Sequence, residues 1–465
     1  MLADEDTYAV LRSRDGRFDG RFFVAVVTTG VYCRPSCPAA LPKRENVRFY
    51  RSSAAALEAG FRACKRCRPD TTPGSPEWNV RADVTGRAMQ LIADGLVDRE
   101  GVGGLAAKLG YSERQLRRQL TTDLGAGPQA LARAQRAANA RTLLETTDLP
   151  ASEIAFAAGF STIRQFNDTL RKVYGTTPTA LRGSRPANHP PGVLHLRLAY
   201  RPPIDLTYLF AYLAERAIPG LEEATTTSYR RALTLPHGLG LVTLRPAKAY
   251  VSCELRLDDY KDLAAAVRRC RRLLDLDADP RDIADHLTQD PHLADSVMAT
   301  PGRRVPGTVD PAEMAIRAIA NEETPAGKTL LTHLIHTYGT PVHGIHAFPL
   351  MHTLTDPDLP PPITAMATAL TTGTVNLGPE ADRDQAERDL RTLPGIQEDT
   401  IARIRMRAFG DPDVFLPADP AVQEGLHRLG LTAQQAHRWR PWRSYAMHHL
   451  ITPGPPHCPN VRGLL

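Results

Sequence analysis

Two short cysteine pairs constrain this chain more than any other feature. Cys33 and Cys37 lie four positions apart, Cys64 and Cys67 lie three apart, and the other three of the seven cysteines are scattered. Two such pairs can supply the four ligands of a tetrahedral zinc site. The alternatives are disulfides or reduced, buried cysteines, and the cytosolic character of the chain makes disulfides unexpected. The spacing therefore predicts one Zn2+ per chain, bound by these four residues.

The cysteines lie within three longer runs, which are TTGVYCRPSC at 28–37, RENVRFY at 44–50 and AGFRACKRCRPD at 59–70. Over about residues 5–75 this pattern resembles the N-terminal domain of the bacterial Ada adaptive-response protein. The resemblance implies a suicidal methyltransferase, in which one zinc-bound thiolate irreversibly takes a methyl group from a methylphosphotriester in DNA. By position the methyl acceptor is Cys33, and Cys37, Cys64 and Cys67 are the remaining ligands.

The implied chemistry is consistent with a zinc-thiolate centre. A thiolate, not a thiol, is the nucleophile, and zinc keeps the sulfur deprotonated at neutral pH. Methyl transfer converts the thiolate to a neutral thioether, so the site loses one negative charge. Repulsion from neighbouring phosphates then falls, and we expect the methylated protein to bind DNA more tightly and to activate alkylation-repair genes.

Basic residues near the cysteines are candidates for contacts with DNA phosphates. They are Arg34, Arg62, Lys65, Arg66 and Arg68. The resemblance singles out Thr29, Arg62 and Arg66 as backbone contacts. It also leads us to expect an arginine at the position of Ala40, so one phosphate contact is predicted to be missing.

Charge is unevenly distributed along the 465 residues. The front part, residues 1–185, has 28 Lys and Arg against 19 Asp and Glu, whereas the rear part, residues 186–465, has 29 against 32. The front part is therefore where double-stranded DNA is expected to bind. An acidic N-terminus without a signal-peptide pattern, and the absence of a long apolar run, predict a cytoplasmic, nucleoid-associated protein with no membrane partner.

Residues 80–182 have a helical pattern with two similar segments. In VGGLAAKLGYSERQLRRQL (102–120) a glycine turn separates two helices, with Ser112 as the N-cap and Leu116 and Leu120 facing inward. A second copy, ASEIAFAAGFSTIRQFNDTLRK (151–172), turns at Gly159. With the ending YGTTPTALR (174–182), this arrangement resembles the AraC-family double helix-turn-helix, and RNA polymerase is then an expected partner.

The second helix of each copy is expected to enter the major groove. The candidate base or phosphate contacts are Glu113, Arg114, Arg117 and Arg118 in the first copy and Thr162, Arg164, Gln165 and Asn167 in the second. The alternative is that these side chains form only a solvated helix face.

The rear part begins with alternating apolar residues at 194–198, which predict a strand, and a helix is expected around 206–213. Further strands are expected at 229–235, 239–245 and 249–256, followed by a helix at 260–275. Residues 308–450 have a nearly continuous helical pattern. Five blocks of the rear part resemble AlkA-type 3-methyladenine DNA glycosylases. They are YRPPID (200–205), VPGTVDP (305–311), LPGI (393–396), DVFLPAD (413–419) and WRPWRSYA (439–446). The resemblance implies a helix-hairpin-helix and a catalytic aspartate, Asp419 by position, which supports loss of a flipped-out base. The alternative role for Asp419 alone is an N-cap before Pro420.

Two expected DNA-contacting segments depart from that family. Gln397 replaces the second hairpin glycine and is followed by Glu398 and Asp399, and the first helix ends in NEETP (321–325) with Glu322, Glu323 and a helix-breaking Pro325. These carboxylates are expected to repel phosphates. We therefore predict base release at least about tenfold weaker than in an intact family member.

These observations predict a mainly α multidomain protein with α+β parts. Residues 1–76 form a small zinc-bound α+β methyl-acceptor domain, and 77–185 form an all-α double helix-turn-helix domain. Residues 193–305 form an AlkA-like α+β subdomain, 306–452 an all-α helix-hairpin-helix domain, and 453–465 a tail. The predicted function is a methyl-sensing transcription regulator with a weakened or inactive glycosylase-like domain. One alternative is a bifunctional protein with an active glycosylase, and another is a transcription factor whose rear domain only packs or dimerises.

Overall fold

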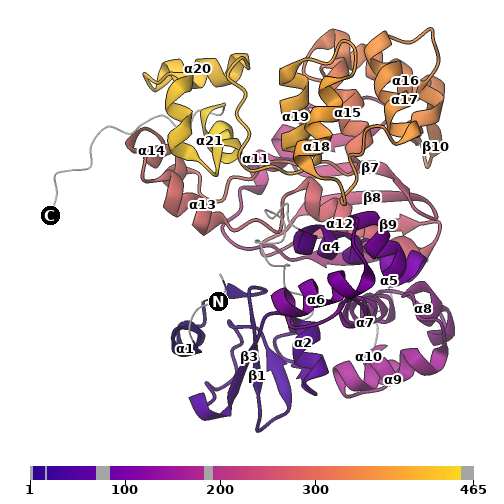
Figure 1. Ribbon diagram of the computed structural model, residues 1–465, viewed down its shortest axis with the longest axis vertical. Coiled ribbons are helices and arrows are strands. Elements are labelled where there is room, and N and C mark those ends of the chain that lie inside the picture. Colours follow the sequence, from indigo (N-terminus) through magenta and orange to yellow (C-terminus); the bar gives the residue numbers. More distant parts are fainter. Residues whose placement is uncertain (1–3, 16–17, 70–83, 183–191, 452–465) are drawn as a thin grey trace, which may run out of the picture.

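A computed structural model describes residues 4–15, 18–69, 84–182 and 192–451 (Figure 1). The chain is mainly α-helical and contains two small sheets and one short hairpin, which confirms the predicted fold class. The predicted tail at 453–465 lies outside the described residues. Within those ranges, no helix is both long and apolar enough to cross a membrane.

The front part begins with a four-stranded sheet of order β3-β1-β2-β4. Strand β1 pairs antiparallel with β2 and β3, whereas β2 and β4 are parallel. Ser52 caps helix α2 by accepting a hydrogen bond from the Ala55 amide. The elements are α1 (Asp4–Ser13), β1 (Phe23–Val26), β2 (Val31–Cys33), β3 (Val47–Tyr50), α2 (Ser53–Glu58) and β4 (Arg62–Ala63).

Seven helices follow, and they contain both predicted helix-turn-helix units. The first unit turns at Gly110 (φ +75°) and the second at Gly159 (φ +88°), where the left-handed backbone favours glycine. Ser112 forms a capping box with Gln115. The helices are α4 (Val84–Ala93), α5 (Leu96–Leu109, kinked at Gly101), α6 (Glu113–Leu124), α7 (Pro128–Thr146), α8 (Ala151–Ala157), α9 (Ile163–Tyr174) and α10 (Pro178–Arg182).

The rear part opens with a five-stranded antiparallel sheet of order β5-β9-β8-β7-β6. The predicted strands and the two helices are present, and a short edge strand, β6, was not predicted. The elements are β5 (Leu194–Leu198), α11 (Leu206–Glu215), β6 (Glu222–Thr225), β7 (Ser228–Leu235), β8 (Gly238–Pro246), β9 (Val251–Leu257) and α12 (Leu263–Leu273).

The remaining helices form two packed groups. Helices α15 (Pro311–Ala320), α16 (Pro325–Tyr338), α17 (Pro361–Thr372), α18 (Arg383–Arg391) and α19 (Glu398–Ala408) share one core. Helices α13 (Pro280–Leu287), α14 (Pro291–Ala299), α20 (Pro420–Arg428) and α21 (Arg443–Leu450) share another. Residues on both sides of position 305 therefore belong to one hydrophobic cluster, and the domain boundary at that position remains a prediction.

The nearly continuous helical pattern predicted for 308–450 is wrong at one place. An antiparallel hairpin, β10 (Thr340–Val342) and β11 (Ile345–Ala347), follows α16 and packs on β7. The helical pattern does break near Pro325, as predicted. Pro325 itself is the first residue of α16, directly after the N-cap Thr324. Helix α15 has already ended at Ala320, where Asn321 adopts a left-handed φ of +56°.

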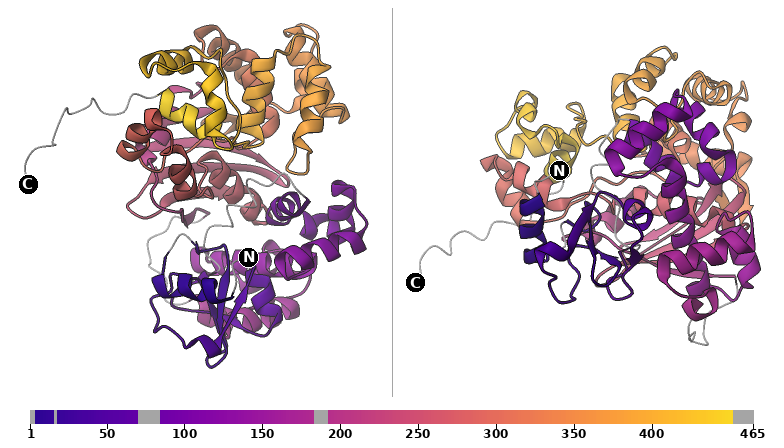
Figure 2. Two further views of the ribbon diagram at one scale, coloured as in Figure 1. Left: turned by 60° about the vertical axis from the view of Figure 1, so that its left-hand side comes forward. Right: turned by 60° about the horizontal axis from the view of Figure 1, so that its bottom comes forward.

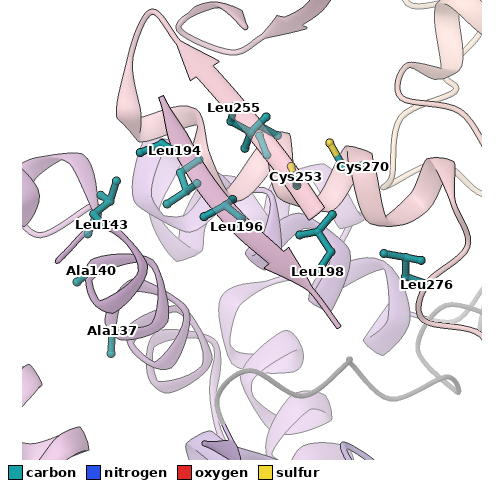
Figure 3. Close-up of a cluster of buried hydrophobic side chains, with 14 of the residues drawn as sticks. Ala137, Ala140, Leu143, Leu194, Leu196, Leu198, Cys253, Leu255, Cys270 and Leu276 are labelled. Carbon is teal, nitrogen blue, oxygen red and sulfur yellow. The ribbon is translucent and has the colours of Figure 1, made fainter. Parts of the chain in front are cut away.

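The front and rear parts pack closely on each other. In Figure 1 and in the left view of Figure 2 the five-stranded sheet lies between the front part and the helices α15–α19. One buried cluster joins Phe23 of β1, Leu143 of α7 and Leu194 of β5. Figure 3 shows Ala137, Ala140 and Leu143 of α7 beside the leucines of the edge strand β5.

Candidate metal centre and DNA-binding residues

The four predicted zinc ligands lie together. The sulfur atoms of Cys33, Cys37, Cys64 and Cys67 are all within 4.8 Å of one another. Three of these side chains are buried, Cys64 is half-buried, and all four are free thiols rather than disulfides. Across the described ranges this is the one cluster of three or more His, Cys, Asp or Glu side chains that could hold a metal ion.

Strand pairing explains why residues so far apart in sequence converge. Cys33 is the last residue of β2, and Cys64 directly follows β4. Because these strands are parallel, with Tyr32 opposite Ala63, the residues that follow reach the same edge of the sheet. The Cys64 amide donates to the Tyr32 carbonyl at 3.0 Å, and the Cys37 amide donates to the Arg34 carbonyl at 3.1 Å.

The ionisation of these sulfurs fits a bound cation. A hydrogen bond with Cys37 is the largest cause that raises the pKa of Cys33, while the same contact lowers the pKa of Cys37 to about 2. Without a cation, the pKa values of Cys33 and Cys67 are therefore raised beside the Cys37 thiolate. Four thiolates at tetrahedral spacing are the ligand set that Zn2+ prefers, so the donor set fits the predicted single zinc ion.

The buried carboxylate of Asp19 orders the loop between the first two cysteines. This residue was not among those predicted from the sequence. Asp19 is 6 % exposed and accepts hydrogen bonds from the Ser36 amide at 3.0 Å and the Ser36 hydroxyl at 2.6 Å. It also lies 3.5 Å from the Arg34 guanidinium. Burial is the main cause that raises the pKa of Asp19. No local motif marks Asp19, because its partners lie more than ten residues away.

The predicted phosphate contacts around the cysteines fall into two groups. Thr29, Lys65 and Arg66 are exposed, as is Ala40 at the position where an arginine is expected. The others already contact the protein: Arg34 lies beside Asp19, Arg68 bonds Glu145 of α7 at 2.6 Å, and the exposed Arg62 lies over Gly175 at the end of α9.

The predicted helix-turn-helix contacts lie on exposed helix surfaces. Glu113, Arg114, Arg117 and Arg118 on α6 and Arg164 and Gln165 on α9 are exposed, whereas Asn167 is half-buried. Arg164 is 3.9 Å from Asp168 one turn away. Thr162 has a structural role as well, because its side chain caps α9 by accepting from the Gln165 amide at 3.1 Å.

Asp419 occupies the N-cap of α20. One carboxylate oxygen accepts hydrogen bonds from the amides of Ala421 and Val422, and the other binds the Arg403 guanidinium of α19 at 2.7 Å. The capping alternative from the sequence is therefore present. A surface pocket of about 780 Å³ lies beside Arg230 and His343, and Asp419 is not among the residues that line it.

Comparisons with known proteins agree with this architecture. Residues 6–70 match the metal-binding domain of Ada, 105–184 match a helix-turn-helix domain, and 195–310 match the AlkA N-terminal domain. A Mycobacterium tuberculosis protein named "Probable bifunctional transcriptional activator/DNA repair enzyme AlkA" is 50% identical over 475 residues, covering 96% of each chain. The chain belongs to this Ada–AlkA family.

Two Escherichia coli proteins each resemble one part of the Ada–AlkA chain. The bifunctional transcriptional activator/DNA repair enzyme Ada is 36% identical over 173 residues, covering 36% of this chain and 47% of Ada. DNA-3-methyladenine glycosylase 2 is 29% identical over 277 residues, covering 54% of this chain and 95% of the glycosylase. The Ada–AlkA chain thus joins a front part similar to Ada to a rear part similar to a DNA glycosylase.

The acidic residues in the AlkA-like part of this Ada–AlkA protein are mostly neutralised, contrary to our expectation. Glu322 is 4 % exposed and lies between Arg317 and Arg407, 3.1 Å from the latter. Burial acts to raise its pKa, but the two arginines lower the pKa below its usual value. Glu322 is therefore part of a buried ion-pair network, and its predicted repulsion of phosphate is wrong.

The other three predicted acidic residues differ in their partners. Glu323 pairs with Arg216 at 3.0 Å and with Arg403 at 3.1 Å. Glu398 pairs with Arg391 at 2.9 Å, and Asp399 alone has no ion-pair partner in the described part of the chain. Charge repulsion at these segments is therefore smaller than the sequence suggests.

Proposed function

We propose that this chain detects alkylated DNA by methylating itself at Cys33. The Cys33 thiolate attacks the methyl carbon of a methylphosphotriester, so a carbon–sulfur bond forms and the carbon–oxygen bond breaks. The phosphate oxygen keeps the electron pair and becomes an ordinary phosphodiester anion. Zinc, when bound, keeps the thiolates deprotonated at neutral pH. The transfer is irreversible, so each chain reacts once.

The convergence of four cysteine sulfurs within 4.8 Å is the observation that carries this proposal. The assignment of Cys33 rests on the resemblance of the run TTGVYCRPSC (28–37) to the Ada motif, within residues 6–70 that match the metal-binding domain of Ada. Cys64 is the more exposed thiol and is the competing acceptor that an experiment must distinguish. Duplex DNA with a radiolabelled methylphosphotriester should label the wild-type chain, and Cys33→Ser should abolish labelling even if it retains some zinc.

The same event is proposed to switch DNA binding. Thiolate methylation removes one negative charge from a site whose exposed neighbours, Lys65 and Arg66, face solvent. Phosphates then approach with less repulsion. The exposed side chains of α6 and α9 read promoter DNA by entering adjacent major-groove segments, and the bound protein recruits RNA polymerase. The proposal includes the domain boundaries predicted from the sequence, with the methyl-acceptor domain at 1–76, the helix-turn-helix domain at 77–185, and the two rear domains at 193–305 and 306–452.

For the rear part we propose base excision that is weak or absent. A glycosylase carboxylate must face the sugar of the flipped nucleotide, but both oxygens of Asp419 are already bound by the protein. Arg403 would have to move before the carboxylate could act. The hairpin before α19 also carries Gln397 where a glycine would let backbone amides approach a phosphate.

A second candidate function is active excision of alkylated bases. The similarity to DNA-3-methyladenine glycosylase 2 over 54% of the chain favours it. A time course of 3-methyladenine release by the full-length chain distinguishes the two. We expect release at least about tenfold slower than by the E. coli enzyme, the loss expected from one or two missing phosphate contacts. Rapid release that disappears in Asp419→Asn would establish the second function.

A further inference from the structure

The segment before β1 is one of the places where the front part meets the rear part. Arg21 pairs with Asp279 at 2.7 Å and also with Asp282, both at the start of α13. Arg281 lies 3.8 Å from Asp15. Each part supplies both an arginine and a carboxylate to these ion pairs, so the two surfaces are electrostatically complementary.

Arg201 is the most buried polar group at this interface. Arg201 follows β5 in the sequence, and its side chain is 2 % exposed. One guanidinium nitrogen donates to the backbone carbonyl of Asp19 at 2.7 Å, and another donates to the backbone carbonyl of Asp277 at 2.9 Å. Its own carbonyl accepts from Arg304 at 2.8 Å. A buried arginine held at both ends fixes the position of Asp19 relative to the rear sheet.

Asp19 is also the residue that orders the loop between Cys33 and Cys37. Its carboxylate holds the amide and hydroxyl of Ser36, and Arg34 lies 3.5 Å away. A continuous series of contacts therefore runs from Arg201 through Asp19 to the loop that carries the methyl acceptor.

We infer that Arg201 is a positioning residue for methyl transfer, so that the AlkA-like part serves as a scaffold for the acceptor loop. The inference rests on the proposed methyl transfer at Cys33. The reaction requires the sulfur to approach the methyl carbon in line with the breaking carbon–oxygen bond, and a small displacement of the attacking atom slows such a reaction steeply. The rear part thus has a role that needs no base excision.

The test compares full-length Arg201→Ala with a matched control, Arg197→Ala. Arg197 is an exposed residue of β5 that lies over the Tyr250 ring and forms no hydrogen bond or ion pair with the described residues of the front part. With methylphosphotriester duplex DNA, we expect Arg201→Ala to lower the single-turnover rate constant at saturating DNA about tenfold. The half-saturating DNA concentration and the zinc content should not change, and Arg201→Lys should restore part of the rate.

Hydrogen exchange gives a second readout that does not depend on activity. The Ser36 amide is bonded to Asp19, so peptides spanning 33–37 should exchange faster in Arg201→Ala and normally in Arg197→Ala. If Arg201→Ala does not fold, Asp279→Asn loosens the same interface while an asparagine still caps α13. Wild-type rate and wild-type exchange in a folded variant would overturn the inference. If the wild-type chain itself takes up no methyl group, the proposed function fails, and exchange alone decides the positioning role.

Discussion

The cysteine centre and the Asp419 site differ in what their polar atoms contact. At the cysteine centre the four sulfurs lie within 4.8 Å of one another. At the rear site each oxygen of Asp419 already has a protein partner, either the first-turn amides of α20 or Arg403. The first arrangement requires an external cation, whereas the second is complete by itself.

This difference shows how a motif residue should be interpreted. The DVFLPAD block correctly places an aspartate before a helix, but both carboxylate oxygens of that aspartate already accept hydrogen bonds from the protein. The cysteine pairs, in contrast, place four sulfurs together that can all be thiolates only when a metal ion is bound. A residue type indicates chemistry only when its reactive atoms remain available.

The largest expected effect comes from removing one zinc ligand. Cys64→Ala should lose zinc and unfold residues 4–69, because structural zinc contributes about 10–16 kcal/mol to small metal domains. Metal analysis and circular dichroism of the full-length chain would measure both changes. Cys270→Ala, at a buried cysteine in the rear part, should keep one zinc per chain. A folded Cys64→Ala protein with bound zinc would contradict the predicted ligand set.

Acid should destabilise the rear helices through two buried histidines. Burial lowers the pKa of His448 well below its usual value and that of His449 to about 3. Because the unfolded state binds protons near pH 6.5 and the folded state does not, stability is present above that pH and is lost below it, by about 1.4 kcal/mol per unit for each histidine.

Asp275 opposes this trend in part. Burial raises its pKa to about 6, so the folded state gains a proton first and gains stability as the pH falls from about 6 to 4. We expect a net loss of about 2–3 kcal/mol between pH 6.5 and 5. Urea unfolding monitored by the fluorescence of buried Trp439 measures it. His449→Gln should remove most of the net pH dependence, because the single remaining histidine is then largely offset by Asp275, and a flat wild-type profile would show that the histidines titrate normally.

Asp419 allows the two sites to be compared by stability rather than activity. Asp419→Ala removes a helix cap and the ion pair to Arg403, so it should lower the free energy of unfolding by about 1–2 kcal/mol. Asp419→Asn retains the cap and should cost less. If Asp419→Asn leaves stability unchanged but abolishes measurable base release, the carboxylate is catalytic and the comparison with the cysteine centre fails.

The smallest expected effect is the change of DNA affinity on self-methylation. Loss of one negative charge near two or three phosphates should tighten binding roughly threefold at low salt. The increase should diminish as salt is added, because it is electrostatic. Fluorescence anisotropy with methylated and unmethylated protein gives both affinities, and equal values at low salt would exclude a charge switch.

The sequence predicts features that depend on local patterns. The cysteine pairs, the Ser112 cap and the Gly159 turn are all present, because each depends on residues a few positions apart. Contacts between distant residues were not predictable. Arg201 reaches Asp19 across 182 positions, and Arg403 binds Asp419 across two different helices.

The error on Glu322 has the same origin. A carboxylate after a helix suggests an exposed charge, but three buried arginines, Arg231, Arg317 and Arg407, pair with Glu222, Glu313 and Glu322 between the sheet and the helices. Such a network balances charges from β6, β7, α15 and α19, so no single segment reveals it. The β10–β11 hairpin was missed because its strands have only three residues each.

Mass mapping of the acceptor tests the central claim most directly. The full-length chain is incubated with duplex DNA containing methylphosphotriesters and then digested, and each cysteine peptide is measured. We predict the added mass of one methyl group on the peptide containing Cys33 and on no other cysteine peptide. A methyl group on Cys64, Cys37 or Cys67, or an unmodified Cys33 after complete repair of the DNA, would contradict the account.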